Sequence, residues 1–395
     1  MRRSFLIVFF TLPLFAQTVT IGSQSVTAGA LLNSAAAPYT LVDLSHPATT
    51  NGSIAYVSTG WGGGTCSGAY KVKVLRPAST TSLGNFTLVA ERGPFNVTGE
   101  RNRVQLTPPI DVEKGDLLAI TMLQPFATCG VVKSSISSGS VVMRLTGDVT
   151  VGNFNGTYLR DNALAARGTD TASVLEGVIP AAGSLQGALG SFFRTSIQLG
   201  CPFGGRCNGT LTYHPANAPF SANDVTIPYT LTGNGAVSFP DIVQTMGQSG
   251  LGTLDITSDD GFPPLATARI YNDAGANGTS GFTEDMIRPA DFLHAGDTAI
   301  LFTPSDLGLF RMSIGVRTLS APANVSVQFG NGRISLVKDF PANTFSQVTL
   351  SDFGDTDPLP NEQISFTVNS GHVAIYASTT DNKTNDSSAR FAKRE

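Results

Sequence analysis

Two stretches of the sequence decide the fold: FFRTSIQL at 192–199 and LFRMSIGV at 309–316. Both contain Phe-Arg-x-Ser-Ile, and in both an alternating run of apolar and polar residues leads through a turn into a second alternating run. Because successive side chains of a strand point to opposite faces, this pattern predicts a β-hairpin at each place. A motif that occurs twice raises the question of whether its surroundings are repeated as well.

The surroundings are repeated in the same order, at offsets of about 110 residues. The further pairs are VSFPDIVQTMG (237–247) with FSQVTLSDFGD (345–355), GTLDITSDDG (252–261) with EQISFTVNSG (362–371), ATARIYND (266–273) with AIYASTTDN (374–382), and two polar tails that close on Phe282 and Phe391. An ordered series of this kind predicts a tandem duplication. We expect two β-sandwich repeats with immunoglobulin-like or related topology, at 179–295 and 296–395.

Four pieces of the first copy, FRTSIQL, PDIV, ARIYND and GTSGF, also resemble repeats found in a largely uncharacterised family of exported bacterial proteins. The resemblance covers about residues 180–395. It implies a secreted β-sandwich repeat and supplies no catalytic residues. The sequence departs from that family at the first hairpin turn, where CPFGGRC (201–207) replaces a plain Asn-Pro type of turn.

The segment 17–147 has a different character. Its strand-like runs are separated by turn residues, and KVKVLRPA (71–78) together with PIDVEKGDLLAI (109–120) resembles jelly-roll modules of extracellular bacterial proteins. From 148 to 178 small and polar residues dominate, which predicts a linker or an irregular extension between domains. The whole chain is therefore expected to be all-β, with a jelly-roll-like β-sandwich followed by two tandem repeats.

The first residues, MRRSFLIVFFTLPLFAQ, predict export. Two arginines precede a short apolar stretch that ends at Ala16, which is the pattern of a secretory signal peptide over residues 1–16. The stretch is too short to cross about 30 Å of hydrocarbon. We expect a secreted protein, placed outside the cell, on its surface or in a periplasm, with no membrane span after the signal is removed.

Four cysteines fit this compartment: Cys66, Cys129, Cys201 and Cys207. An even number of cysteines in an exported chain predicts disulfides. Three pairings are open, and proximity in the sequence favours Cys66–Cys129 and Cys201–Cys207. A metal site is the alternative for the short Cys201–Cys207 spacing, but no further cysteine or neighbouring histidine completes a tetrahedral set.

Composition and motifs argue against two classes of function. Charged residues make up 14% of the chain, below the usual level of about a quarter, and the formal net charge is −4. Nucleic-acid binding depends on clustered Lys and Arg, and the sequence has no basic run. It also lacks GxSxG, HExxH, GxxxxGK[ST] and GxGxxG, and its four histidines are scattered. We expect neither a nucleic-acid partner nor an enzyme, and no cofactor.

Aromatic residues supply the candidates for ligand binding. Trp61 precedes three glycines, with Tyr56 and Tyr70 nearby, and aromatic faces on loops stack on sugar rings. The alternative, which we favour, is that Trp61 packs in the core. The cluster Asp352, Asp355 and Asp357 is a weak candidate for calcium, because its spacing does not match an EF-hand.

Taken together, the sequence predicts a monomeric, non-catalytic structural or interaction protein at the cell surface or outside the cell. The alternative is a module that binds polysaccharide through its N-terminal domain. An extracellular hydrolase ranks third. The expected partner is an extracellular polysaccharide or another surface protein.

Overall fold

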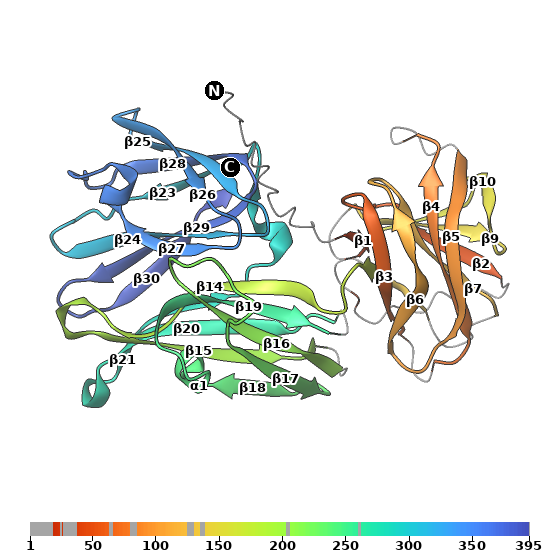
Figure 1. Cartoon of the computed structure of the whole chain (residues 1–395), viewed down its shortest axis with the longest axis horizontal. Helices are drawn as coiled ribbons and strands as arrows, with labels where there is room; N and C mark the ends of the chain where they lie inside the picture. The colour runs from red at the N-terminus through yellow and green to blue at the C-terminus, as the bar shows by residue number, and fades with distance from the viewer. Residues whose placement is uncertain are drawn as a thin grey trace, which may run out of the picture.

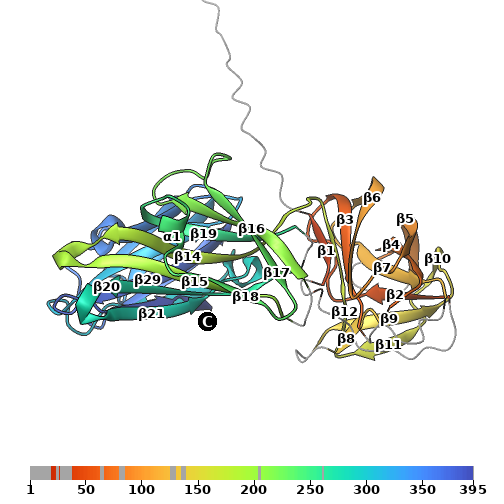
Figure 2. The same cartoon turned by 90° about the horizontal axis from the view of Figure 1, so that it is seen from below.

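The computed structural model describes residues 19–23, 26, 38–62, 66–79, 85–124, 130–134, 139–202, 206–259 and 262–394. These residues form β-strands almost throughout, and the single α-helix among them, α1 (Ile242–Thr245), is one turn long. The all-β prediction is confirmed. Figures 1 and 2 show three groups of strands: an N-terminal part lies at one side, and two further groups are stacked on each other beside it.

The N-terminal part, residues 19–169, consists of antiparallel sheets with a main apolar core and a second, smaller apolar cluster. One sheet has the order β1-β13-β3-β6, a second has the order β10-β5-β4-β7-β2-β9-β11, and β12 pairs with β8. Apolar side chains such as Val57, Val72 and Ile120 fill the core between them. The strands are β1 (Thr20–Gly22), β2 (Tyr39–Asp43), β3 (Gly52–Gly60), β4 (Ala69–Pro77), β5 (Asn85–Asn96), β6 (Arg101–Val112), β7 (Leu117–Met122), β8 (Val132–Ser134), β9 (Val141–Thr146), β10 (Val151–Asn153), β11 (Thr157–Arg160), β12 (Asn162–Leu164) and β13 (Ala166–Thr169).

The linker predicted over 148–178 is wrong. This segment forms β10 to β13 of the N-terminal part and the start of the next strand. Strands β10 and β11 are the two edges of their sheet and are largely exposed, so they lack the apolar alternation that marks a half-buried strand. Strand β13 is central and needs small residues: a Cβ on Gly168 would lie 2.7 Å from Ile21 and 3.0 Å from Ile54.

The second group of strands, which we call sandwich A, covers residues 174–285. Its elements are β14 (Val174–Gln186), η1 (Ala188–Gly190), β15 (Phe192–Gly200), β16 (Arg206–Pro215), β17 (Thr226–Thr232), β18 (Ala236–Phe239), α1, β19 (Gly250–Ser258), β20 (Leu265–Asp273), η3 (Gly275–Asn277) and β21 (Thr279–Asp285). Strands β17-β16-β19-β14 form one layer and β18-β15-β20-β21 the other, while the end of β14 also pairs with β15. Ile197, Leu211 and Leu254 belong to the core between the layers.

The third group, sandwich B, covers residues 289–394. Its elements are η4 (Pro289–Asp291), β22 (Leu293–His294), β23 (Thr298–Phe302), β24 (Phe310–Thr318), β25 (Ala323–Phe329), β26 (Ile334–Phe340), β27 (Phe345–Thr349), η5 (Leu350–Phe353), β28 (Gln363–Ser370), β29 (His372–Asp381), β30 (Ser387–Phe391) and β31 (Lys393–Arg394). Strands β26-β25-β28-β23 form one layer, and β27-β24-β29-β30 form the other. Ile314, Val327 and Phe366 belong to its core.

The two sandwiches share one pairing order. Strand β15 pairs with β18 and β20, and β24 pairs with β27 and β29. Strand β16 pairs with β17 and β19, and β25 pairs with β26 and β28. Every repeated stretch of the sequence therefore falls on strands with equivalent neighbours, with FFRTSIQL on β15 and LFRMSIGV on β24.

The outer face of the layer β27-β24-β29-β30 of sandwich B packs against sandwich A. Ala181 of β14 packs with Phe345 of β27 and Tyr376 of β29 in a shared apolar cluster. At one margin sandwich A also donates two backbone hydrogen bonds to sandwich B, from Asn217 N to Phe345 O at 2.8 Å and from Phe220 N to Asn343 O at 3.0 Å. The face of β24 that carries Arg311 is thus covered by sandwich A, and Figure 1 shows the two groups of strands stacked on each other.

The N-terminal part contacts sandwich A through two arginines of β6. Arg101 donates to the backbone oxygens of Arg206, at 2.9 Å, and Pro202, at 3.0 Å, next to the disulfide. Arg103 donates to the backbone oxygens of Thr171 and Ala172 in the connection to β14. The Arg101 contacts attach the first part to the disulfide hairpin of sandwich A, and the Arg103 contacts attach it to the segment that leads into β14.

The predictions about export depend on residues outside this description, because the signal peptide at 1–16 lies before residue 19. Within the described part of the chain, no helix has the length and apolar character needed to cross a membrane.

Candidate functional site

The aromatic candidates of the N-terminal part do not form a sugar-binding surface. Trp61 and Tyr70 are fully buried, with ring centroids 5.1 Å apart, and the Trp61 indole Nε1 donates to Thr59 Oγ1 at 2.9 Å. The ligand-binding prediction is wrong for these two residues, and core packing is the correct alternative. Tyr56 is partly buried, and the guanidinium of Arg103 lies 5.0 Å from its ring centre. A large apolar ring at the end of a strand gains more by filling the core than by facing water.

The cysteine prediction is confirmed for one pair. Cys201 and Cys207 form a disulfide with Cα atoms 5.7 Å apart, and both side chains are buried. Cys66 is buried too, but its predicted partner Cys129 lies outside the described residues.

The three aspartates proposed for calcium have other roles. The carboxylate of Asp352 accepts hydrogen bonds from Thr349 at the start of η5, and buried Asp355 pairs with Arg333 at 2.8 Å. Asp357 is exposed. No group of three potential metal ligands occurs among the described residues, so the calcium prediction has no support in this cluster.

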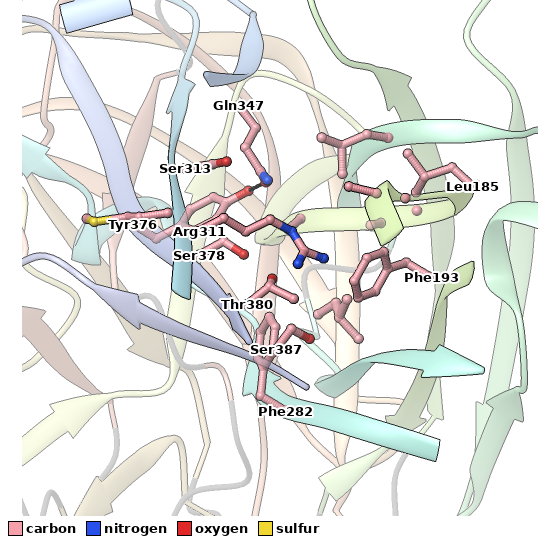
Figure 3. A pocket seen from close by; sticks show the side chains of 18 of the residues that line it. Leu185, Phe193, Phe282, Arg311, Ser313, Gln347, Tyr376, Ser378, Thr380 and Ser387 are labelled. Carbon is pink, nitrogen blue, oxygen red and sulfur yellow. Dashed lines mark hydrogen bonds between the residues drawn. The ribbon is translucent and has the colours of Figure 1, made fainter. Parts of the chain in front are cut away.

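The strongest candidate site is a pocket of about 320 Å³ between the two sandwiches (Figure 3). Sandwich A supplies the open end of its own core, with Leu185 from β14, Phe193 from β15 and Phe282 from β21. Sandwich B covers this opening with its sheet face. The wall from sandwich A is therefore apolar, and the wall from sandwich B carries the polar groups.

The polar wall follows from strand register. Arg311 of β24 lies directly opposite Thr380 of β29, which lies opposite Ser387 of β30. Directly opposed residues of antiparallel strands point to the same face, so these three side chains form one row. The next row contains Ser313 opposite Ser378. Figure 3 shows the labelled side chains of both rows projecting into the pocket.

A third row closes the pocket at the opposite end. Tyr376 lies opposite Gly315, and its ring occupies the space that a side chain at 315 would need, since an added Cβ would lie 2.1 Å from the ring carbons. The hydroxyl of Tyr376 donates to Gln347 Oε1 at 2.7 Å. Burial is the main cause that raises the pKa of Tyr376 well above its ordinary value, so this phenol stays neutral.

Arg311 is the charged group of the pocket, and its partners are neutral. Its Nη1 donates to Asn382 Oδ1 at 3.1 Å, and its Nη2 donates to Asn385 Oδ1 at 2.9 Å. Within the described chain, no carboxylate forms an ion pair with it. Burial lowers the pKa of Arg311, and the charge of Asp381 opposes this effect. A guanidinium does not lose its proton in proteins, so a positive charge remains in the pocket with no ion-paired carboxylate among the described residues.

Two further polar groups lack partners near the pocket. The Oγ of Ser387 is buried and makes no hydrogen bond with any residue that the structure describes. Both carboxyl oxygens of Glu284, on β21, are also buried, and neither accepts a hydrogen bond of normal geometry from described residues. Burial raises the pKa of Glu284 to about 8, against a smaller opposing effect of the Ala181 backbone, so this carboxyl group is mostly protonated at neutral pH.

Sequence reasoning singled out the motif that contains Arg311 but did not identify the site. A usable signal was present in the comparison of the copies. In sandwich A the equivalent Arg194 pairs with Asp241, the N-cap of α1, and with Asp273. In sandwich B the N-cap of η5 is Thr349, and Asn382 replaces the second acid.

The chain matches no known family model, no curated protein and no solved structure. The resemblance to exported bacterial repeats therefore remains a prediction from the sequence.

Proposed function

We propose that this chain is an exported, non-catalytic binding protein that holds a small monocarboxylic acid with an apolar body between its two sandwiches. One observation carries the proposal: Arg311 is the charged residue in a pocket whose other polar groups are neutral, and it has no ion-paired carboxylate among the described residues. A ligand carboxylate would supply the missing negative charge, and the apolar wall of sandwich A would bury the rest of the ligand.

The proposed position of the carboxylate follows from the first polar row. Arg311 offers its guanidinium, and the hydroxyls of Thr380 and Ser387 lie beside it on the same sheet face. Ser387 Oγ has an unused hydrogen-bonding capacity that a carboxylate oxygen would satisfy. Hydrogen bonds between a charged donor and a charged acceptor are stronger than neutral ones.

The size and chemistry of the pocket favour binding over catalysis. About 320 Å³ lies at the lower end of the range for small-molecule sites, which suits a ligand the size of octanoate. The polar lining consists of a guanidinium, hydroxyl groups and an amide, and none of these titrates near neutral pH. Glu284 does titrate there, but it is buried and is not among the residues that line the pocket.

The proposed location stays as predicted from the sequence. The signal-like N-terminus and the disulfide support a site of action outside the cytoplasm. We no longer propose polysaccharide binding through Trp61, because its ring is buried.

The test compares octanoate with octanol by isothermal titration calorimetry. Octanoate is expected to bind and octanol to bind at least tenfold more weakly. Arg311→Gln should weaken octanoate binding by about 10- to 100-fold, since hydrogen bonds to charged groups contribute about 1.5–3 kcal/mol. Arg194→Gln is the matched control, because it removes the equivalent charge from sandwich A and should leave the affinity unchanged.

Equal binding of octanoate and octanol would contradict the proposal, as would unchanged octanoate affinity in the Arg311→Gln variant. The melting temperature of each variant shows whether a loss of binding reflects a loss of folding.

A further inference from the structure

A second cavity lies where all three parts of the molecule meet. It has a volume of about 340 Å³ and is separate from the pocket of the proposed function. The N-terminal part contributes Thr20, Thr49 and Arg167, while Glu176 and Asp255 come from sandwich A. Sandwich B contributes Arg317 and His372, and Arg288 comes from the connection between the two sandwiches. Three guanidinium groups thus face one space together with two carboxylates.

Two of the arginines use only part of their hydrogen-bonding capacity on these carboxylates. Arg167 Nη1 donates to Glu176 at 3.1 Å, and Arg317 Nη2 donates to Asp255 at 2.9 Å. The Nε of Arg167 and the Nε and Nη1 of Arg317 are buried and have no hydrogen-bond partner in the described chain. The Arg317 side chain is only 1% exposed, so bulk water does not satisfy these N–H groups.

The third arginine has no carboxylate at all among the residues described. Arg288 lies between β21 and η4, lines the cavity and forms no ion pair there. The lining therefore carries one more positive than negative charge. His214 also contacts Asp255, at 3.3 Å, so this carboxylate is already shared between two partners. Burial, together with His294, lowers the pKa of His372, which keeps its ring mostly neutral.

We propose that this cavity binds an oxyanion of the phosphate or sulfate type, attracted by the three guanidinium groups of its lining and held chiefly by Arg288, which has no ion pair among the described residues. Planar guanidinium groups match the oxygens of such anions, and several donors on different elements suit an anion with three or four oxygens better than a halide. The cavity has more space than a free ion needs, so a phosphate or sulfate ester fits as well.

Binding there would connect the parts of the molecule. Arg167 belongs to the N-terminal part, Arg317 belongs to sandwich B, and Arg288 directly precedes η4 in the connection between the two sandwiches. A bound oxyanion would bridge them and favour the arrangement in which all three parts are in contact. A ligand that binds only this arrangement stabilises it by mass action.

The test measures binding of inorganic phosphate, sulfate and phenyl phosphate to the full-length protein at constant ionic strength, with chloride as the reference ion. Phosphate is expected to raise the melting temperature with a saturable dependence, and ³¹P NMR should show line broadening of the bound ion. Arg288→Gln should weaken phosphate binding at least tenfold. Arg390→Gln removes one charge from an exposed position away from the cavity and should change nothing.

Arg288 has no ion pair to lose, so the variant should fold normally, and its melting temperature without phosphate verifies this. Tighter binding of phenyl phosphate than of the free ion would identify an ester as the ligand, whereas the reverse order would identify the free anion. A rise in melting temperature no larger than that in chloride, or unchanged binding in Arg288→Gln, would overturn the proposal. Neither result depends on binding of a carboxylic acid in the other pocket.

Discussion

Arg194 of sandwich A and Arg311 of sandwich B occupy the same place in the repeated motif, but they meet different partners. Arg194 pairs with Asp241 at 2.7 Å and with Asp273 at 2.9 Å. Arg311 meets two asparagine side chains instead. The same strand plan thus yields a neutralised surface cation in one copy and, in the other, a positive charge with no ion-paired carboxylate among the residues that the structure describes.

The stacking of the copies explains why this difference matters. Arg194 is 27% exposed on the free face of sandwich A, where a pair with two acids stabilises little but is easily maintained. Arg311 lies on the covered face of sandwich B, beside an apolar pocket. An ion-paired carboxylate at Arg311 would compete with the carboxylate of the proposed ligand, whereas Asn382 and Asn385 leave the charge of the guanidinium unpaired among the described residues.

The interface also contains the opposite case, a carboxyl group without a counter-ion. Glu284 of sandwich A and Arg311 of sandwich B are both incompletely paired. A carboxyl group can lose its charge by taking a proton, and Glu284 does so, with a pKa of about 8. A guanidinium does not become neutral in this way, so Arg311 keeps its charge and can attract an anionic ligand.

The largest expected effect concerns Glu284 and pH. Its pKa is 4.5 in the unfolded chain and about 8 in the folded protein, so between these values only the folded state holds the proton. The unfolding free energy should therefore fall as pH rises from 4.5 to 8 and then level off, by up to about 5 kcal/mol from this group. Urea unfolding at several pH values measures the slope.

Glu284→Gln should remove that slope and make the protein more stable above pH 7, because the amide carries no charge. Glu100→Gln, at an exposed position, is the control and should preserve the slope. A Glu284→Gln variant with the pH dependence of the original protein would show that Glu284 is not the group responsible.

The next largest effect is a difference in unfolding free energy between substitutions of the two arginines of β24 that face sandwich A. Arg317 is paired with mostly buried Asp255, and Arg311 is paired with no described carboxylate. Burial tends to raise the pKa of Asp255, but Arg317 and His214 outweigh this and lower it. Arg317→Met should cost about 3 kcal/mol, because it leaves a buried carboxylate short of its partner. Arg311→Met should cost less than about 1 kcal/mol, because only neutral amides lose a donor.

Urea unfolding of both variants at pH 7 measures this difference. Similar losses for the two substitutions would contradict the distinction between the paired and the unpaired arginine.

Much of the fold could be predicted from local patterns. Alternation in 309–316 predicted a strand that the structure places at β24, and the order of the repeated stretches matches the order of equivalent strands. The prediction failed where the alternation of apolar and polar residues was absent. The edge strands β10 and β11 are largely exposed, so their polar residues resembled a linker. Trp61 was ambiguous because glycines flank aromatic residues both in cores and in binding loops.

The candidate site was harder to predict because packing creates it. Leu185 and Ser387 lie far apart in the sequence, and they share a pocket only because sandwich B covers the open end of sandwich A. No periodicity within one strand encodes that contact. The replacement of Asp273 by Asn382 in the second copy was readable, but its meaning depends on knowing which face is covered.

The smallest effect tests the comparison directly, by giving sandwich B one of the acids of sandwich A. Asn382 already accepts a hydrogen bond from Arg311 at 3.1 Å, so Asn382→Asp places a carboxylate where the ligand-free protein lacks one. The substitution should raise the unfolding free energy by about 1 kcal/mol, and it should weaken octanoate binding about tenfold because the guanidinium is already paired. The reciprocal change, Asp273→Asn, should destabilise sandwich A by up to about 1 kcal/mol and leave octanoate binding unchanged. If Asn382→Asp binds octanoate as tightly as the original protein does, the charge of Arg311 does not contribute to binding of the ligand carboxylate.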